Sequence, residues 1–163
     1  MSAFFSAIAI TDHNTGRGYA EYCHLRNETR LNYDLNSTRG DAGELLKQLK
    51  QELLSFASLT VFPGVEISIY PGIHVILIFE ETTDAEKISD FLRQDLALGD
   101  AEQSGDPTVV SQLTPTAALD KATERFGAKC FAVLPHVDSS KGAWKELEGT
   151  SRAQLFTHPL DLC

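Results

Sequence analysis

The sequence has few cysteines, and their arrangement argues against two classes of structure. Three cysteines, Cys23, Cys130 and Cys163, occur in 163 residues, and no two of them have Cys-x-x-Cys spacing. An odd, widely spaced set fits neither a disulfide framework nor a cysteine zinc site. We therefore expect a reducing, cytoplasmic setting.

Basic residues are also scarce. The chain contains 14 Lys and Arg against 23 Asp and Glu, which gives a formal net charge of -9. This balance argues against a broad basic face that holds a phosphate backbone. A nucleotide or a nucleic acid would have to be held locally, through a metal ion or a small basic cluster.

Long hydrophobic runs are missing as well. No apolar run approaches the ~18 residues that would indicate a membrane span, so we expect no membrane association. The apolar opening, residues 1–10, lacks both a basic start and a small-residue cleavage site, and it is typical of a buried strand instead of a signal peptide. With 42% hydrophobic residues, the chain is long enough for one domain, residues 1–163.

Hydrophobic periodicity predicts an α/β protein. Continuous apolar runs are typical of strands covered on both faces, and leucines at helical spacing with capping signals are typical of helices. The expected strands are residues 3–10, 59–69, 73–79 and 129–134, with a further strand at 153–157. The expected helices are residues 41–55, 83–99, 114–127 and 141–147. Strands 59–69 and 73–79 flank the turn sequence Tyr70-Pro71-Gly72 and should form a hairpin, whereas residues 100–113 should form a surface loop.

Polar side chains follow two of the predicted strands at the point where each ends. His13 follows strand 3–10, and His136 follows strand 129–134. Active sites of parallel α/β sheets and barrels lie at this carboxyl edge. Glu66 lies inside an otherwise apolar strand, where a carboxylate needs a cation or hydrogen-bond donors.

The predicted hairpin supplies a partner for this carboxylate. With the turn near Tyr70-Pro71, Glu66 and His74 fall nearly opposite each other, and an even register places them on the same face. His13, Glu66, His74 and His136 thus form a candidate set of metal ligands. Imidazole and carboxylate donors suit zinc, manganese or iron better than calcium. A carboxylate can also bridge two ions, which is the usual clamp for phosphoester hydrolysis.

Each candidate ligand also has a simpler interpretation. A lone histidine after a strand can be a hydrogen-bonded turn residue, Glu66 can be paired with Arg or Lys, and His74 can lie on a solvent face. The metal interpretation is favoured because all four side chains occur at strand ends or in one hairpin. His24 is assigned to the surface, and His158 stays a weak candidate.

Neighbouring polar residues extend the candidate site. Asp12, a candidate catalytic residue together with Glu66, is expected to orient a ligand imidazole, with direct metal binding as the alternative. Arg17, Asp138 and Lys141 are candidates for contacting a substrate phosphate, although the last two can equally belong to a helix-capping turn. No serine has nucleophile-elbow spacing, which weakens covalent mechanisms.

These motifs resemble those of the PHP (polymerase and histidinol phosphatase) family. Residues 9–15 resemble its second motif, Phe62 to Ser68 its Gly-Val-Glu motif, and Gly72 to Leu77 the histidine-bearing strand that follows. Pro135-His136 stands where the family has Ala-His-Pro. Residues 136–142 are similar to the version found in TrlF-type PHP domains, which are attached to AAA-like or SMC-like ATPases.

The resemblance implies a distorted (βα)7, TIM-like barrel with two or three metal ions at the carboxyl ends of its strands. The family's opening His-x-His strand and its late Asp-x-His motif are not found in the sequence. We therefore expect a partial PHP-type barrel, incomplete at both ends, from either a fragment or a shortened gene product. Exposed strand edges would favour self-association or a partner chain.

Three functional hypotheses follow. The first is a metal-dependent phosphoesterase, acting on a phosphorylated small molecule or a nucleotide with divalent zinc, manganese or iron. The second is a catalytically impaired regulatory or binding module that works with an ATPase partner or fusion. The third is a solute-binding α/β domain without a metal.

Overall fold

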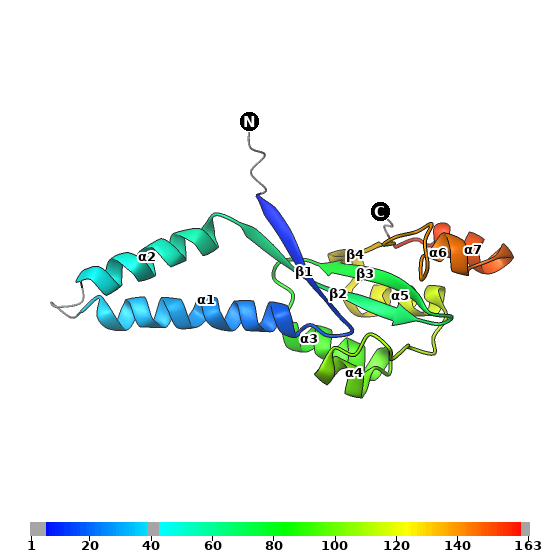
Figure 1. Cartoon of the computed structure of the whole chain (residues 1–163), viewed down its shortest axis with the longest axis horizontal. Coiled ribbons are helices and arrows are strands. Elements are labelled where there is room, and N and C mark those ends of the chain that lie inside the picture. The colour runs from blue at the N-terminus through cyan, green and yellow to red at the C-terminus, as the bar shows by residue number, and fades with distance from the viewer. Residues whose placement is uncertain (1–5, 39–42, 161–163) are drawn as a thin grey trace.

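The computed structural model describes residues 6–38 and 43–160, which form a mixed α/β fold (Figure 1). The strands are β1 (Ala7–His13), β2 (Thr60–Ile69), β3 (Ile73–Phe79) and β4 (Cys130–Val133). The α-helices are α1 (Arg17–Asn36), α2 (Gly43–Ala57), α3 (Ala85–Asp90), α4 (Gly99–Ser104), α5 (Pro115–Phe126), α6 (Ala143–Glu146) and α7 (Gly149–Phe156). A π-helix, η1 (Phe91–Asp95), and a 3-10 helix, η2 (Gly127–Lys129), complete the elements. No helix in this described part of the chain is long and apolar enough to cross a membrane.

The four strands form one open sheet in the order β1-β2-β3-β4. β1 is parallel to β2, whereas β3 is antiparallel to both β2 and β4. The predicted hairpin of β2 and β3 is therefore confirmed. Because β1, β2 and β4 run in the same direction, their carboxyl ends and the start of β3 share one edge of the sheet.

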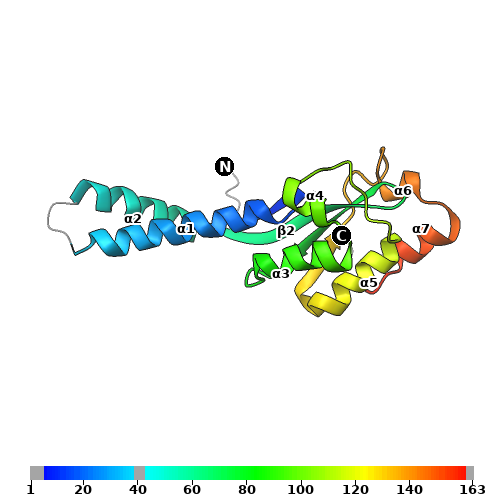
Figure 2. The same ribbon diagram turned by 90° about the horizontal axis from the view of Figure 1, so that it is seen from below.

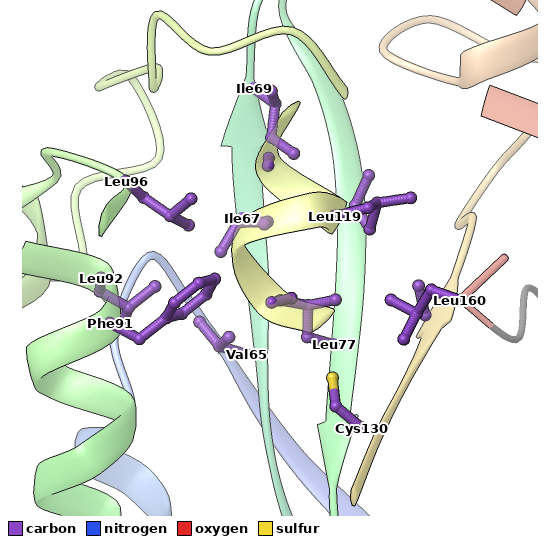
Figure 3. Packing of buried hydrophobic residues seen from close by; sticks show 14 of the residues in the cluster. Val65, Ile67, Ile69, Leu77, Phe91, Leu92, Leu96, Leu119, Cys130 and Leu160 are labelled. Atoms are coloured by element: carbon purple, nitrogen blue, oxygen red, sulfur yellow. The ribbon is translucent and has the colours of Figure 1, made fainter. Parts of the chain in front are cut away.

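The two faces of the sheet have different surroundings, because side chains alternate along each strand. Odd-numbered residues of β2 and β3 face the core, where Ile67 and Leu77 are fully buried. Figure 3 shows these two side chains beside Phe91 of η1 and Leu119 of α5. Even-numbered residues, among them Glu66, face the opposite side, which we call the open face.

Helices α1 and α2 form a hairpin that extends away from the sheet (Figure 1 and Figure 2). Helix α1 was not among the expected helices, and its apolar side chains do not recur on one stripe. Among the residues of α1, only Tyr19 and Thr29 are buried. Helix α2 confirms the helix expected at 41–55 with slightly different bounds, and residue 41 lies outside the described residues.

The first strand differs from its prediction. β1 runs on to His13, and it lies at an edge of the sheet, where it pairs only with β2 among the described residues. Its side chains are half-buried or exposed, and Ile8 is 43% exposed. The expectation of a strand covered on both faces is therefore wrong for this part of it, whereas residues 3–5 lie outside the described residues.

The region expected as one helix followed by a loop folds as three short helices. Asp84 caps α3 through a hydrogen bond from the Glu86 backbone N–H, and η1 and α4 follow. The expected loop at 100–113 is wrong in part, since α4 buries Glu102 and Ser111 is bridged to Ile69 at the end of β2. Glu102 is buried because it is paired, with the Ser89 hydroxyl donating to its carboxylate at 2.8 Å.

The last third of the chain confirms three predicted elements and corrects one. Thr114 caps α5 as predicted, β4 is a strand, and α6 occupies the short helix expected at 141–147. The strand expected at 153–157 is wrong, because these residues belong to α7 or follow it directly. Leu155 is the buried residue of this helix, so buried and exposed side chains do not alternate here as they would in a strand.

Candidate metal centre

Three strands bring His13, Glu66 and His74 together on the open face of the sheet. His13 ends β1, Glu66 lies in β2, and His74 is the second residue of β3. The Nδ1 atoms of His74 and His13 lie 2.7 Å and 4.0 Å from Glu66 Oε1. One potential ligand atom from each residue lies within 4.8 Å of the other two, so the three side chains could hold one metal ion.

Strand register explains why these side chains meet. In the parallel pair, His13 is the partner of Glu66, and in the antiparallel pair Ser68 is the partner of His74. Glu66 itself is paired with Ile76, so Glu66 and His74 are diagonal neighbours on one face. The predicted shared face is correct, and the two residues are offset by two positions along the strands from directly opposite.

The donor atoms fit a divalent cation. His74 Nδ1 is buried and has no hydrogen-bond partner, although Glu66 Oε1 is only 2.7 Å away. The 2.7 Å contact is short enough for a proton or a metal ion to be shared between the imidazole nitrogen and the carboxylate. Ligand atoms around a tetrahedral zinc ion lie about 3.3 Å apart, as metal–ligand distances of ~2.0–2.1 Å require. The distances from Glu66 Oε1 to His74 Nδ1 and to His13 Nδ1, 2.7 Å and 4.0 Å, lie on either side of this value.

The electrostatic surroundings favour neutral imidazoles. Burial lowers the pKa of His13 and that of His74, and the neighbouring Lys141 charge lowers both further. The Glu66 carboxylate acts in the opposite direction and raises both pKa values, but burial is the largest influence on each ring. A neutral imidazole is the form that binds a metal ion.

Two polar residues outside the predicted site, Ser68 and Asn14, support the cluster. Ser68 is buried, and its Oγ lies 2.8 Å from His13 Nε2. Asn14 is fully buried, and its side-chain amide donates to the carbonyls of Asp106 and Val109 at 2.8 Å and 2.9 Å. Asn14 has a φ of 53°, a conformation that asparagine tolerates better than most residues. In the sequence, the feature that points to Asn14 is its position directly after His13 at the end of a strand.

His136 lies beside the cluster without joining it. Its ring centroid is 5.3 Å from that of His74, but it is exposed and is not among the three residues whose ligand atoms converge. The turn that carries His136 returns through Gly142, where a Cβ atom would collide with the His136 carbonyl oxygen. This turn is held to β3, since the His74 backbone N–H donates to the Lys141 carbonyl at 2.9 Å.

Asp12 holds the start of α1. Its carboxylate accepts a hydrogen bond of 2.7 Å from the Gly18 backbone N–H. A side chain at position 18 would collide with that carboxylate, so the close approach requires glycine. A contact of Asp12 with a ligand imidazole, as expected from the sequence, stays a prediction.

Two of the three predicted substrate-binding residues, Arg17 and Lys141, lie near the cluster. Arg17 lines a hollow of about 360 Å³ together with His13 and Asp12, and its Nη1 donates to the Gln103 carbonyl at 2.8 Å. The exposed Lys141 is near enough to influence the pKa of both cluster histidines.

The third substrate candidate and the two remaining histidines lie elsewhere. Asp138 is exposed in the turn after His136. His24 lies on the surface as predicted, 3.3 Å from Glu28. His158 joins the end of the described chain to α5, with its Nε2 atom 3.1 Å from Asp120 Oδ1, so it lies in a structural contact.

The described cysteines lie apart from the cluster. Cys23 and Cys130 are both free, and Cys163 lies outside the described residues. Burial raises the pKa of the Cys130 thiol to about 12, which keeps it protonated and unreactive.

Comparisons with protein-family models, curated proteins and solved structures find no match.

Proposed function

We propose that this chain is a divalent-metal-dependent phosphoesterase in which His13, Glu66 and His74 hold the metal ion. The observation that carries the proposal is the convergence of the ligand atoms of these three residues within 4.8 Å of one another, with His74 Nδ1 2.7 Å from the Glu66 carboxylate. Nitrogen and oxygen donors of this kind favour zinc, manganese or iron.

The resemblance to the PHP family supports the same function. The segments that resemble its motifs, residues 9–15, 62–68 and 72–77, supply the three clustered side chains, and these share one sheet edge. We propose that the four strands are part of a PHP-type barrel of the TIM-like kind, with the open face directed inward. Active sites of such barrels lie at the carboxyl ends of the strands.

The residues around the cluster suit a phosphate ester. A bound divalent ion would supply Lewis-acid stabilisation of phosphate charge and would activate water. Arg17 and Lys141 place positive charge beside His13 and would orient the phosphate group. The hollow of about 360 Å³ beside His13 has room for a phosphorylated small molecule or a nucleotide.

The proposal is tested by measuring metal binding and hydrolysis on the same protein. Zinc and manganese binding is followed by isothermal titration calorimetry, and hydrolysis by release of nitrophenol from mono- and diester phosphates. Glu66→Ala and His74→Ala should each weaken metal binding by at least about 10-fold and abolish the hydrolysis that depends on the metal. His24→Ala, a substitution of an exposed histidine, should change neither. Absence of stoichiometric metal binding in the unaltered chain would overturn the proposal.

A second candidate is a metal-binding module without hydrolytic activity, working with an ATPase partner. It is favoured by the exposed position of His136, which leaves three converging ligands among the described residues. The same experiment separates the two candidates. Tight metal binding with no hydrolysis of either ester would support the module.

A further inference from the structure

The two ring nitrogens of His13 have different surroundings. Nδ1 faces the Glu66 carboxylate of the three-residue cluster, at 4.0 Å from Oε1. Nε2 points the other way and lies 2.8 Å from the Ser68 hydroxyl oxygen. A neutral imidazole carries one proton, so the partner of Nε2 determines which nitrogen can bind a metal ion.

The Ser68 hydroxyl has a second partner. Its oxygen lies 3.4 Å from the Pro107 carbonyl oxygen, which can only accept a hydrogen bond. When Ser68 donates its proton to this carbonyl, its oxygen is free to accept one from His13 Nε2. The three groups then form a chain in which every donor has an acceptor.

We propose that Ser68 is a positioning residue that fixes His13 as the tautomer protonated on Nε2, with the lone pair of Nδ1 directed at the cluster. The inference deepens the proposed function, because in this tautomer Nδ1 would face the metal ion. The second-sphere contact of a metal-binding histidine commonly sets the ring orientation in this way.

The opposite tautomer is less favourable in this geometry. It would place a proton on Nδ1, inside the cluster, where the Glu66 oxygen at 4.0 Å is too distant to accept a hydrogen bond. It would also turn the Ser68 proton toward Nε2 and leave the Pro107 carbonyl without this donor. The contact between Ser68 and Nε2 would persist with its direction reversed, while the proton on Nδ1 would lack an acceptor and would block the cation position.

Backbone contacts on both sides keep the Ser68 hydroxyl in place. The Ser68 N–H donates to the Asn14 side-chain oxygen at 3.0 Å, and the Ser68 carbonyl accepts from the Ser111 N–H at 2.9 Å. Ser68 is 1% exposed, so water does not compete for its hydroxyl. The position of the hydroxyl is therefore fixed before any ion binds.

The tautomer is measured directly in the metal-free protein. Long-range proton–nitrogen NMR spectra of the ¹⁵N-labelled chain, recorded with chelator and well above the ordinary histidine pKa of ~6.5, distinguish the protonated ring nitrogen from the bare one. We expect protonated Nε2 and bare Nδ1 in the unaltered chain. In Ser68→Ala, the His13 signals should move toward the average of the two tautomers.

Metal affinity gives a second readout. Calorimetric titration with zinc should show about 10- to 100-fold weaker binding for Ser68→Ala, the usual range for loss of such a contact. Ser68→Thr, which keeps the hydroxyl, should restore most of the affinity. The matched control is Ser111→Ala, since Ser111 is also buried and donates to the Leu96 carbonyl at 2.8 Å without touching His13.

The outcomes separate this inference from the proposed function. A His13 ring protonated on Nδ1 in the unaltered chain overturns the inference, whether or not the protein binds zinc. Unchanged zinc affinity in Ser68→Ala overturns it as well. Failure of the unaltered chain to bind zinc, manganese or iron, with the expected tautomer present, overturns the proposed function and leaves the role of Ser68 supported.

Discussion

The clustered histidines are partly withdrawn from water and have few partners. His74 is buried, and its Nδ1 atom lies 2.7 Å from Glu66 Oε1. Glu66 is the nearest charge, and burial outweighs its influence on the pKa of both His74 and His13. The cluster is therefore poorly suited to binding protons.

The lowered pKa values of His13 and His74 predict how the stability of the metal-free protein depends on pH. Because the pKa of His13 and that of His74 lie below 6.5 in the folded chain, the unfolded chain takes up protons first. The free energy of unfolding should fall as the pH drops below 6.5 and should level off below the folded-state pKa values. Urea unfolding midpoints, measured with chelator over this pH range, check the slope.

The paired substitution His13→Gln and His74→Gln should remove most of this slope. His24→Ala should retain it, since His24 is exposed. A double variant as pH-sensitive as the unaltered chain would show that other groups cause the effect.

Sequence patterns located the cluster residues but not the residues that hold them in place through hydrogen bonds. His13 and Glu66 stood out because a polar side chain at or near the end of an apolar strand needs a reason. Asn14 and Ser68 could not be assigned in this way, because their partners Asp106, Val109 and Pro107 are distant in sequence. Such contacts depend on how a loop is placed, which local patterns do not encode.

The end of β1 and the segment after α4 are joined through one side chain. Asn14→Ala would leave the Asp106 and Val109 carbonyls and the Ser68 N–H without this partner. We expect the free energy of unfolding to fall by about 2–4 kcal/mol, as for the loss of several buried hydrogen bonds. Urea unfolding measures the loss, and limited proteolysis should show earlier cleavage between residues 105 and 110.

A substitution elsewhere provides the comparison for this prediction. Asn32 is exposed on α1, and Asn32→Ala should change stability by less than about 0.5 kcal/mol. Equal effects of the two substitutions would mean that Asn14 does not join the two segments.

Side chains along β3 alternate between the core and the open face, so neighbouring residues should contribute differently to the free energy of unfolding. Leu77 is fully buried in the core, whereas Ile76 is half-buried on the open face. Leu77→Ala should cost about 2–5 kcal/mol, and Ile76→Ala should cost clearly less. Chemical denaturation of both variants tests this difference, and equal losses would mean that the open face is covered as fully as the core.

Elements with strong local signals were predicted, and those that depend on tertiary contacts were not. The turn at Tyr70-Pro71-Gly72 fixed the hairpin, and Thr114 before Pro115 marked the start of α5. Helix α1 has no apolar stripe, and only Tyr19 and Thr29 among its residues are buried, so periodicity gave no signal for it. The short apolar run near Leu155 is compatible with either a strand or a helix. In the structure it forms helix α7, of which Leu155 is the buried residue.

At the scale of the whole molecule, a sheet with helices on one side carries a projecting helical hairpin (Figure 1). Apolar side chains are exposed on both parts, among them Ile8 on the edge strand at 43% and Leu54 on α2 at 61%. An edge strand presents unpaired backbone groups that can pair with another chain. We therefore predict that the chain self-associates through the edge of β1.

Sedimentation velocity at increasing protein concentration tests this association. Ile8→Lys should shift the distribution toward monomer, since edge lysines oppose strand pairing. Leu54→Lys should leave it unchanged. The reverse result would place the contact on the helical hairpin, and a monomer at every concentration would contradict the prediction.

The three clustered side chains come from separate strands, so a metal ion could bind them together only once the sheet has formed. Positions 13, 66 and 74 approach one another only after β1 has paired with β2 and β2 with β3. An ion that prefers this arrangement would raise the unfolding midpoint as its concentration increases, by mass action. Metal supply would thus govern how long the chain survives in a cell, because a metal-starved chain would open more often and meet proteases sooner.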